Sequence, residues 1–377
     1  MGHGRLHAPM IWSKRKLRGG VERLSRAAGK AVRVEAIEEI VGAHARPRRF
    51  ADILSRVLEF EADPDRYDAA HPRKEQQKYN HRCDYAAAGL VSRALSLFFD
   101  HYDLRSLPRY DAAFVEQNAA ALGKDGYVFL DAFVPSAECN DIVAFLGREQ
   151  VVFCEDLSGR VHRGYTPANV AATTSNVCRI TDQSVLLACP EIAKLVFDPS
   201  LLAIAQAFLG APPIHTQANC WWSVAYSDES EYVKAAAQKF HQDRDYIKFI
   251  KFFFYLTDVG EDNGPHEFVA GSNVDYAEHS RNKQRSSKRL DDERLESGYP
   301  PERFRRFTGP RGSLIIEDTS GFHKGNPVRS GHRLMLQLEY ASSRYGSPPE
   351  HLTRAAMGNV DAETRRFERL FSAYKAA

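Results

Sequence analysis

The residues best suited to chemistry are a histidine and an aspartate one residue apart, in His241-Gln242-Asp243. They stand just before residues 249–258, the strongest run of strand-forming residues in the chain. On extended backbone, side chains at i and i+2 point to the same side, so this spacing presents an imidazole and a carboxylate to a common point. With a second histidine from another strand, the set would be the two-histidine, one-carboxylate arrangement that suits Fe(II) and leaves coordination positions open.

The spacing alone is weak support, because it occurs by chance. In a chain with 14 histidines, about one such pair is expected at random. A second pair, His101-Tyr102-Asp103, does occur. It follows a helical segment and precedes a connector containing leucine and proline, so we interpret it as incidental.

Two downstream residues strengthen the first pair. His323 lies at a turn directly after the predicted strand 313–317, where the mouth of a barrel would be. Arg333 opens the next strand, on the polar one of its two faces. Burying the charge of an arginine on a barrel strand costs free energy unless an anionic group pairs with it. A bound dicarboxylate would be a natural partner, because guanidinium holds carboxylate with two hydrogen bonds; a structural salt bridge is the alternative.

The elements that would position these residues are mostly strands. Turn signals rich in glycine and proline separate them, and little helix lies between, which favours a sandwich or barrel over a parallel sheet with crossover helices. The predicted strands are 214–225, 249–258, 267–269, 313–317 and 334–341. Predicted helices fill residues 32–120, 136–148 and 198–209, and one begins at a cap on Asp361 near the C-terminus.

Composition excludes several classes of protein. The 377 residues are 43% hydrophobic and 27% charged, which is typical of globular proteins and not of disordered ones. A net charge of +2 is too small for the overall charge to indicate nucleic-acid binding. We find no uncharged apolar run near the ~18 residues of a membrane helix and no secretory signal. The six cysteines form no CxxC pair, which favours reduced thiols and a cytoplasmic location.

The ordered set of motifs resembles one known family. The set comprises His241-x-Asp243, Gly264-Pro265 with Gly271-Ser272, and His323 followed after nine residues by Arg333. It is similar to the phytanoyl-CoA dioxygenase (PhyH-like) family of Fe(II)/2-oxoglutarate-dependent oxygenases, over about residues 120–345. Asn273 and Ala270 depart from the family pattern, in which histidine and proline are usual. We expect these departures to affect a loop and not the metal site.

This resemblance implies a mainly β fold with helical additions, whose core is a double-stranded β-helix (a jelly-roll, cupin-like barrel). His241, Asp243 and His323 would bind Fe(II), and Arg333 would bind the distal carboxylate of the cosubstrate 2-oxoglutarate. Gln217 and Asn219, on the strand before the His-x-Asp pair, would also contact 2-oxoglutarate. O2 would be the second cosubstrate.

The resemblance also implies the reaction, hydroxylation of a small organic substrate with release of succinate and CO2. An aspartate at position 243 favours oxygenation over halogenation, while desaturation or cyclisation stays open. The alternatives are a jelly-roll binding module without catalysis and a cupin-type metalloenzyme that does not use 2-oxoglutarate. We expect a small-molecule substrate and neither nucleic acid nor membrane as partner; the sequence leaves the oligomeric state and the substrate open.

The chain is expected to divide into three parts. Residues 1–115 would form a helical region that packs on the core, 116–345 the oxygenase domain, and 346–377 a C-terminal helix. Within the domain, residues 280–307 carry nine Lys/Arg and five Asp/Glu and would form a lid-like insertion or a solvated loop.

Overall fold

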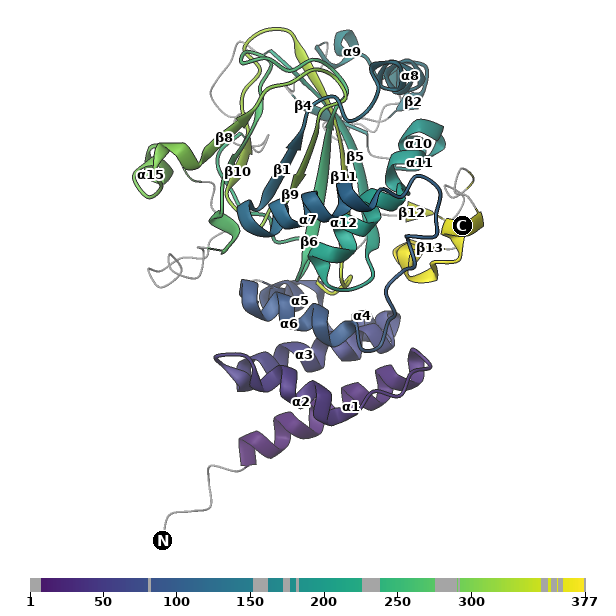
Figure 1. Cartoon of the computed structure of the whole chain (residues 1–377), viewed down its shortest axis with the longest axis vertical. Helices are drawn as coiled ribbons and strands as arrows, with labels where there is room; N and C mark the ends of the chain where they lie inside the picture. The colour runs from purple at the N-terminus through teal and green to yellow at the C-terminus, as the bar shows by residue number, and fades with distance from the viewer. Residues whose placement is uncertain are drawn as a thin grey trace.

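Two facing β-sheets form the centre of the molecule, with helices packed around them (Figure 1). The computed structural model describes residues 8–80, 83–151, 162–171, 177–180, 183–225, 238–274, 290, 292–346, 352–353, 358 and 362–375. All structural statements below concern these residues.

The larger sheet has six strands in the order β1-β9-β6-β11-β5-β4, and neighbouring strands are antiparallel. Its two long central pairings join β11 to β5 and β11 to β6. The strands are β1 (Tyr127–Leu130), β4 (Val177–Arg179), β5 (Ile214–Val224), β6 (Phe249–Tyr255), β9 (Leu314–Glu317) and β11 (His332–Ala341).

The smaller sheet has three antiparallel strands in the order β10-β7-β8. These are β7 (His266–Val269), β8 (Phe304–Phe307) and β10 (His323–Gly325). Its apolar side chains pack against the larger sheet in one cluster that includes Phe268 and Phe307 from one side and Phe253 and Met335 from the other. Two antiparallel sheets closed face to face by Greek-key-type connections are a jelly-roll, so the predicted double-stranded β-helix core is confirmed.

Alternation along the strands separates the inside of the barrel from its outside. On β6, Phe253 faces the interior cluster, while Phe252 and Phe254 belong to the main core outside. That outer core is covered by α7 (Ala112–Asp125) and α12 (Pro199–Leu209), together with α8 (Ser136–Leu146), α9 (Pro167–Ala171), α10 (Gln183–Ala188) and α11 (Pro190–Val196). A two-stranded ribbon, β2 (Gln150–Val151) with β3 (His162–Arg163), completes this part.

The N-terminal helices form a separate layer with its own core, stacked against one end of the barrel (Figure 1). They are α1 (Ala8–Ala27), α2 (Val34–Gly42), α3 (Pro47–Ala62), α4 (Pro64–Ala70), α5 (Arg73–Asn80) and α6 (Tyr85–Leu95). Ile247 and Tyr345 of the barrel side are buried in this helical core, and Asn80 donates a hydrogen bond to the backbone oxygen of Tyr345. The layer is therefore joined to the barrel by apolar and polar contacts.

The C-terminus differs from the single helix expected there. It contains a short α16 (Ala362–Arg365), a 3₁₀ turn η3 (Glu368–Phe371) and β13 (Tyr374–Lys375), which pairs with β12 (Leu352–Thr353). Phe367, Leu370 and Phe371 are buried in the main core, and they reach it from a broken backbone because tertiary packing outweighs helical propensity here. The predicted cap, Asp361, lies outside the described residues.

The expected lid at 280–307 falls partly outside the described residues, which omit 275–289 and 291. Its remainder comprises α15 (Asp292–Glu296), the 3₁₀ turn η1 (Pro301–Arg303) and β8, which is an edge strand of the smaller sheet. The end of the predicted insertion is thus part of the barrel wall, because its residues pair in register with β7.

One stretch, Pro190–Leu209, is long and apolar enough to cross a membrane by length and composition. It comprises α11 and α12, and 72% of its apolar window is buried inside the structure. Core helices of soluble proteins pass the same test, so the stretch is weak support for a membrane span.

Candidate metal centre

Backbone pairing brings the three predicted metal ligands together at the end of the barrel that faces the N-terminal helices. His241 and His323 form an antiparallel bridge, with both of their N–H···O distances at 3.0 Å. The amide of Asp243 donates to the backbone oxygen of Thr319 at 2.9 Å, which continues this pairing. Two segments 76 residues or more apart in sequence are thereby held side by side.

The ligand atoms of these residues converge. His241 Nε2 lies 3.6 Å from Asp243 Oδ1, and His323 Nε2 lies 3.4 Å from Asp243 Oδ2. All three ligand atoms are within 4.8 Å of one another, and no other group of this kind occurs among the described residues. Ligands bound to one metal at about 2.1 Å lie about 3 Å apart at right angles, so a small adjustment would close the site around a cation.

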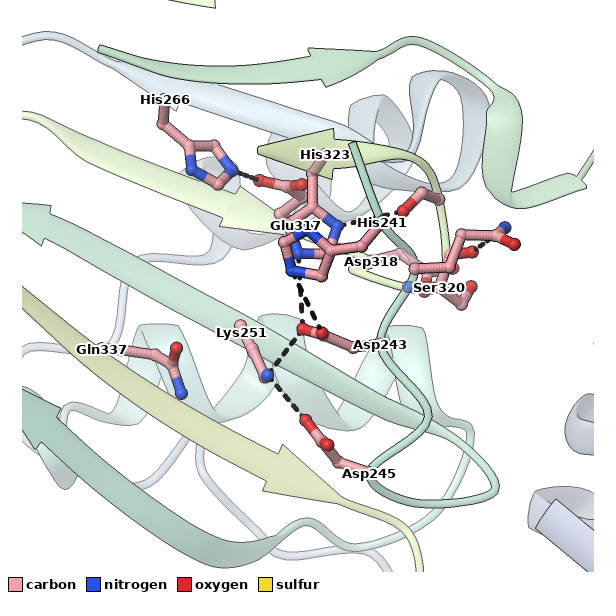
Figure 2. A network of polar contacts seen from close by, with 12 residues as sticks. His241, Asp243, Asp245, Lys251, His266, Glu317, Asp318, Ser320, His323 and Gln337 are labelled. Atoms are coloured by element: carbon pink, nitrogen blue, oxygen red, sulfur yellow. Dashed lines mark hydrogen bonds and ion pairs between the residues drawn. The ribbon is translucent and has the colours of Figure 1, made fainter. Parts of the chain in front are cut away.

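Hydrogen bonds fix which nitrogen of each imidazole faces the cluster. Nδ1 of His241 lies 2.9 Å from the backbone oxygen of Lys239, and Nδ1 of His323 lies 3.0 Å from that of Gly321. A carbonyl can only accept, so Nδ1–H donates in both rings and the Nε2 lone pair is left for a metal. Figure 2 shows both rings above the Asp243 carboxylate.

The charge states also fit a divalent metal. Burial, together with the neighbouring His323, lowers the pKa of His241 to about 4, so its ring is neutral at neutral pH. Burial alone would raise the pKa of Asp243, but Lys251 and the two histidines outweigh it and hold that pKa well below its usual value. At His323, burial alone would lower the pKa, but Asp243 outweighs it and raises that pKa, so a metal would have to displace a proton from this ring.

Arg333 lies inside the barrel without an acidic partner. Its side chain is 4% exposed, Nη1 donates to the backbone oxygen of Gly264, and Nη2 donates to Ser223 Oγ at 3.3 Å. Its Nε is buried without a partner, and burial lowers the pKa of the guanidinium. The structural salt bridge that the sequence left open is absent among the described residues. A buried cation of this kind is suited to an anionic ligand.

A glycine makes room for that guanidinium beside the metal cluster. A Cβ on Gly325 would lie 3.3 Å from Arg333 Nη2. Gly325 is two residues after His323 on β10, so the guanidinium and the imidazole approach the same part of the interior. A short ligand could reach from one to the other.

Gln217 and Asn219 lie on β5, opposite Glu339 and Gln337 of β11. Gln217 Oε1 accepts a hydrogen bond from Gln337 Nε2 at 3.2 Å. The structure thus puts both residues beside the polar face of β11, and their expected contact with 2-oxoglutarate stays a prediction.

Lys251 is the main site residue that we did not predict. It is 6% exposed on the inner face of β6, and its ammonium lies 2.7 Å from Asp243 Oδ2 and 2.7 Å from Asp245 Oδ2 (Figure 2). Two carboxylates outweigh the cost of burial and hold the pKa of this lysine well above its usual value. Strand alternation from Phe253 could have placed Lys251 inside the barrel, but not beside Asp243.

We expect Lys251→Met to weaken Fe(II) or Co(II) binding by about 10- to 100-fold, because partners that orient a metal ligand contribute that much. Calorimetric titration measures the affinity, with the melting temperature as a check on folding. Asp245→Asn is the matched control: it removes the other partner of Lys251 and leaves Asp243 in place. Equal metal affinity in Lys251→Met and the unsubstituted protein would contradict this role.

A second unpredicted feature is a buried pair beside the cluster. His266 Nε2 lies 2.7 Å from Glu317 Oε2, and both side chains are buried. The His266 ring centroid is 5.7 Å from that of His323, while Glu317 Oε1 has no partner (Figure 2). His266 faces the interior, between Phe253 and Phe307.

Among curated proteins, none matches the sequence. Several solved structures resemble the fold. They include the epimerase SnoN in complex with Fe3+, alpha-ketoglutarate and nogalamycin RO, which is 18% identical, with a TM-score of 0.41 over 61% of this chain and 84% of that one. HygX from Streptomyces hygroscopicus, with nickel, 2-oxoglutarate and hygromycin B bound, is 17% identical, with a TM-score of 0.40 over 60% and 86%. AviO1 from Streptomyces viridochromogenes Tue57 is 17% identical, with a TM-score of 0.38 over 63% and 96%.

The family comparison covers more than half of the chain. The model for phytanoyl-CoA dioxygenase (PhyH) matches residues 122–335, from the end of α7 into β11. This range contains His241, Asp243, His323 and Arg333, and it excludes the N-terminal helical layer. The chain belongs to the phytanoyl-CoA dioxygenase (PhyH) family of Fe(II)/2-oxoglutarate-dependent oxygenases.

Proposed function

We propose that this protein is a 2-oxoglutarate-dependent non-haem iron dioxygenase that hydroxylates a small organic substrate and releases succinate and CO2. The observation that carries the proposal is the convergence of two imidazole Nε2 atoms and one carboxylate, with both Nδ1 atoms bound to backbone carbonyls. This donor set is typical of Fe(II) oxygenases and leaves positions open for cosubstrates.

Iron, when bound, supplies the activation of O2 that couples oxidative decarboxylation of 2-oxoglutarate to oxygen transfer. The chain's own residues hold and orient the reactants. His241, Asp243 and His323 would bind the metal, and Arg333 would bind the distal carboxylate of 2-oxoglutarate. Gln217 and Asn219 would add polar contacts to the same ligand.

Exclusion of water is the other part that the protein would supply. The interior between the sheets is lined by a buried apolar cluster that includes Phe253, Phe268 and Ile315. An apolar lining that excludes water strengthens the electrostatic contacts of bound ligands and protects reactive species from side reactions.

Two residues favour this reaction over the alternatives. A carboxylate at position 243 occupies the place that a halogenase would keep for halide, which supports oxygenation. The buried guanidinium of Arg333, which has no acidic partner among the described residues, supports a dicarboxylate cosubstrate over a cupin-type enzyme without one and over a binding module without chemistry. We propose a cytoplasmic enzyme with a small-molecule substrate.

The test is a turnover assay. Purified protein with Fe(II), ascorbate and 2-oxoglutarate should form succinate slowly without a prime substrate, and only when O2 is present. A screen of candidate metabolites for faster succinate release would then identify the substrate. Succinate formation that is independent of O2, or none at all with iron and 2-oxoglutarate bound, would refute the proposed reaction.

A further inference from the structure

A pocket lies where the N-terminal helical layer meets the barrel, and its walls come from both. Its cavity volume is about 40 Å³, which is room for a small polar group such as a carboxylate and not for a whole substrate. The helical layer contributes the residues at the start of α6, and the barrel contributes the loop after Asp243 and the turn after β9. The lining residues are Cys83, Asp84, Tyr85, Ala88, Arg244, Ile247, Lys248, Phe249, Asn273, Asp318 and Ser320.

The barrel wall of this pocket is the backbone that holds the metal ligands. Asp243 N–H donates to Thr319 O, and the side chain of Gln242 donates to Ser320 O at 2.6 Å. Phe249, also in the wall, has its ring centroid 5.7 Å from the ammonium of Lys251, which contacts Asp243. The pocket therefore adjoins the candidate metal centre; Figure 2 shows Asp318 and Ser320 on one side of it.

Lys248 presents an unpaired positive charge to the pocket. Its ammonium lies 4.9 Å from the ring centroid of Phe208, and it makes no ion pair within the described part of the chain. Burial lowers its pKa, with Asp318 acting in the opposite direction. A largely buried ammonium without a counter-ion costs free energy unless a ligand offsets it.

Tyr85 adds a second donor. Its hydroxyl has no hydrogen-bond partner among the described residues, and burial together with Asp318 raises its pKa to about 12. It is 36% exposed, which is unusual for a large aromatic side chain in this structure. At neutral pH the phenol is therefore protonated and able to donate.

The acidic side chains of the pocket are already occupied. Asp318 accepts from the backbone and hydroxyl of Ser320 at 3.1 and 2.6 Å, and from Asn273 Nδ2 at 3.0 Å. Asp84 caps α6 by accepting from the amide of Ala87. Among the described lining residues, Lys248 and Tyr85 are donors that lack an acceptor, while the buried Oδ1 of Asn273 is an acceptor that lacks a donor. Three groups with displaced pKa values (Tyr85, Lys248 and Asp318) in one pocket are also typical of functional sites.

We propose that this pocket binds an oxyanion, a carboxylate or phosphate group, of the prime substrate, with Lys248 and Tyr85 as the contacting donors. The assignment to the prime substrate rests on the proposed oxygenase function; the anion site itself does not. It also gives the N-terminal layer, which lies outside the family match, a direct part in substrate recognition. The apolar side chains Ala88, Ile247 and Phe249 would contact the carbon atoms that join this group to the rest of the substrate.

The test measures binding of two probes to the full chain loaded with Ni(II) and saturating 2-oxoglutarate, so that the Arg333 site is filled. Hexanoate represents carboxylates and inorganic phosphate represents phosphates, each titrated by ligand-detected NMR. At least one should bind at millimolar concentration. Lys248→Met should weaken that binding at least tenfold, because a hydrogen bond to a charged group is lost, and Tyr85→Phe should weaken it about threefold.

Lys124→Met, at an exposed position on α7, is the matched control and should bind like the unsubstituted protein. If neither probe binds, or if Lys248→Met binds as tightly as the control, the anion site is refuted. If binding is lost in Arg333→Met but kept in Lys248→Met, the probe occupies the 2-oxoglutarate site and the proposal is equally refuted. Since no turnover is measured, failure of the succinate assay alone would overturn the oxygenase function and leave this site standing.

Discussion

Replacing Asp243 by alanine is expected to lower succinate formation by more than about a hundredfold and to weaken Fe(II) binding at least as much. Loss of an outer partner of a metal ligand costs about 10- to 100-fold, and loss of the ligand itself costs more. The fold should persist, because Lys251 keeps Asp245 at 2.7 Å and the histidine rings keep their bonds to backbone carbonyls. Succinate rate, metal affinity by calorimetry and a thermal melt measure these three outcomes.

The chain offers a matched control for this substitution in its second His-x-Asp pair. Asp103 has the same spacing from His101, but both side chains are exposed in the connector before α7. Asp103→Ala should therefore retain full turnover and metal affinity. If Asp243→Ala also keeps full activity, the carboxylate ligand has been assigned wrongly.

Replacing Arg333 by methionine is expected to raise the KM for 2-oxoglutarate by roughly a hundredfold or more. A guanidinium can donate two charge-assisted hydrogen bonds to a carboxylate, each worth about 1.5–3 kcal/mol. Lysine keeps the positive charge but cannot donate this planar pair of hydrogen bonds. The KM of Arg333→Lys for 2-oxoglutarate should therefore lie between those of Arg333→Met and the unsubstituted protein. Succinate formation as a function of 2-oxoglutarate concentration gives KM and kcat for each variant.

The melting temperature of the Arg333→Met variant distinguishes an arginine that binds a ligand from one that stabilises the fold. Arg333 is buried with an unpartnered Nε and no ion pair among the described residues. We therefore expect Arg333→Met to melt no lower than the unsubstituted protein in the absence of ligands, because an unpaired buried charge is removed. Arg329→Met, at an exposed position before β11, is the control for KM. An unchanged KM in Arg333→Met would exclude the assigned role.

Local patterns predict much of the barrel because they reflect strand geometry. The strands expected at 214–225, 249–258 and 334–341 appear as Ile214–Val224, Phe249–Tyr255 and His332–Ala341. The i, i+2 spacing of His241 and Asp243 predicts a common side, and the structure brings both side chains to His323. These features depend on residues close in sequence.

What the sequence does not predict depends on contacts between distant segments. In the sequence, Lys251 is a single charged residue within an apolar strand. Only the fold brings its ammonium into contact with Asp243. The His266–Glu317 pair joins β7 to β9 across the barrel interior. The pocket beside Lys248 requires the N-terminal layer to be placed at the correct end of the barrel, which no local pattern specifies.

The measurement that tests the central claim most directly is an anaerobic calorimetric titration of the full chain with Fe(II), followed by 2-oxoglutarate. The account predicts one Fe(II) per chain and 2-oxoglutarate binding that is strong only with metal present, with the first step lost in Asp243→Ala and the second weakened in Arg333→Met. If metal and 2-oxoglutarate bind neither separately nor together, the protein is not an Fe(II)/2-oxoglutarate-dependent oxygenase.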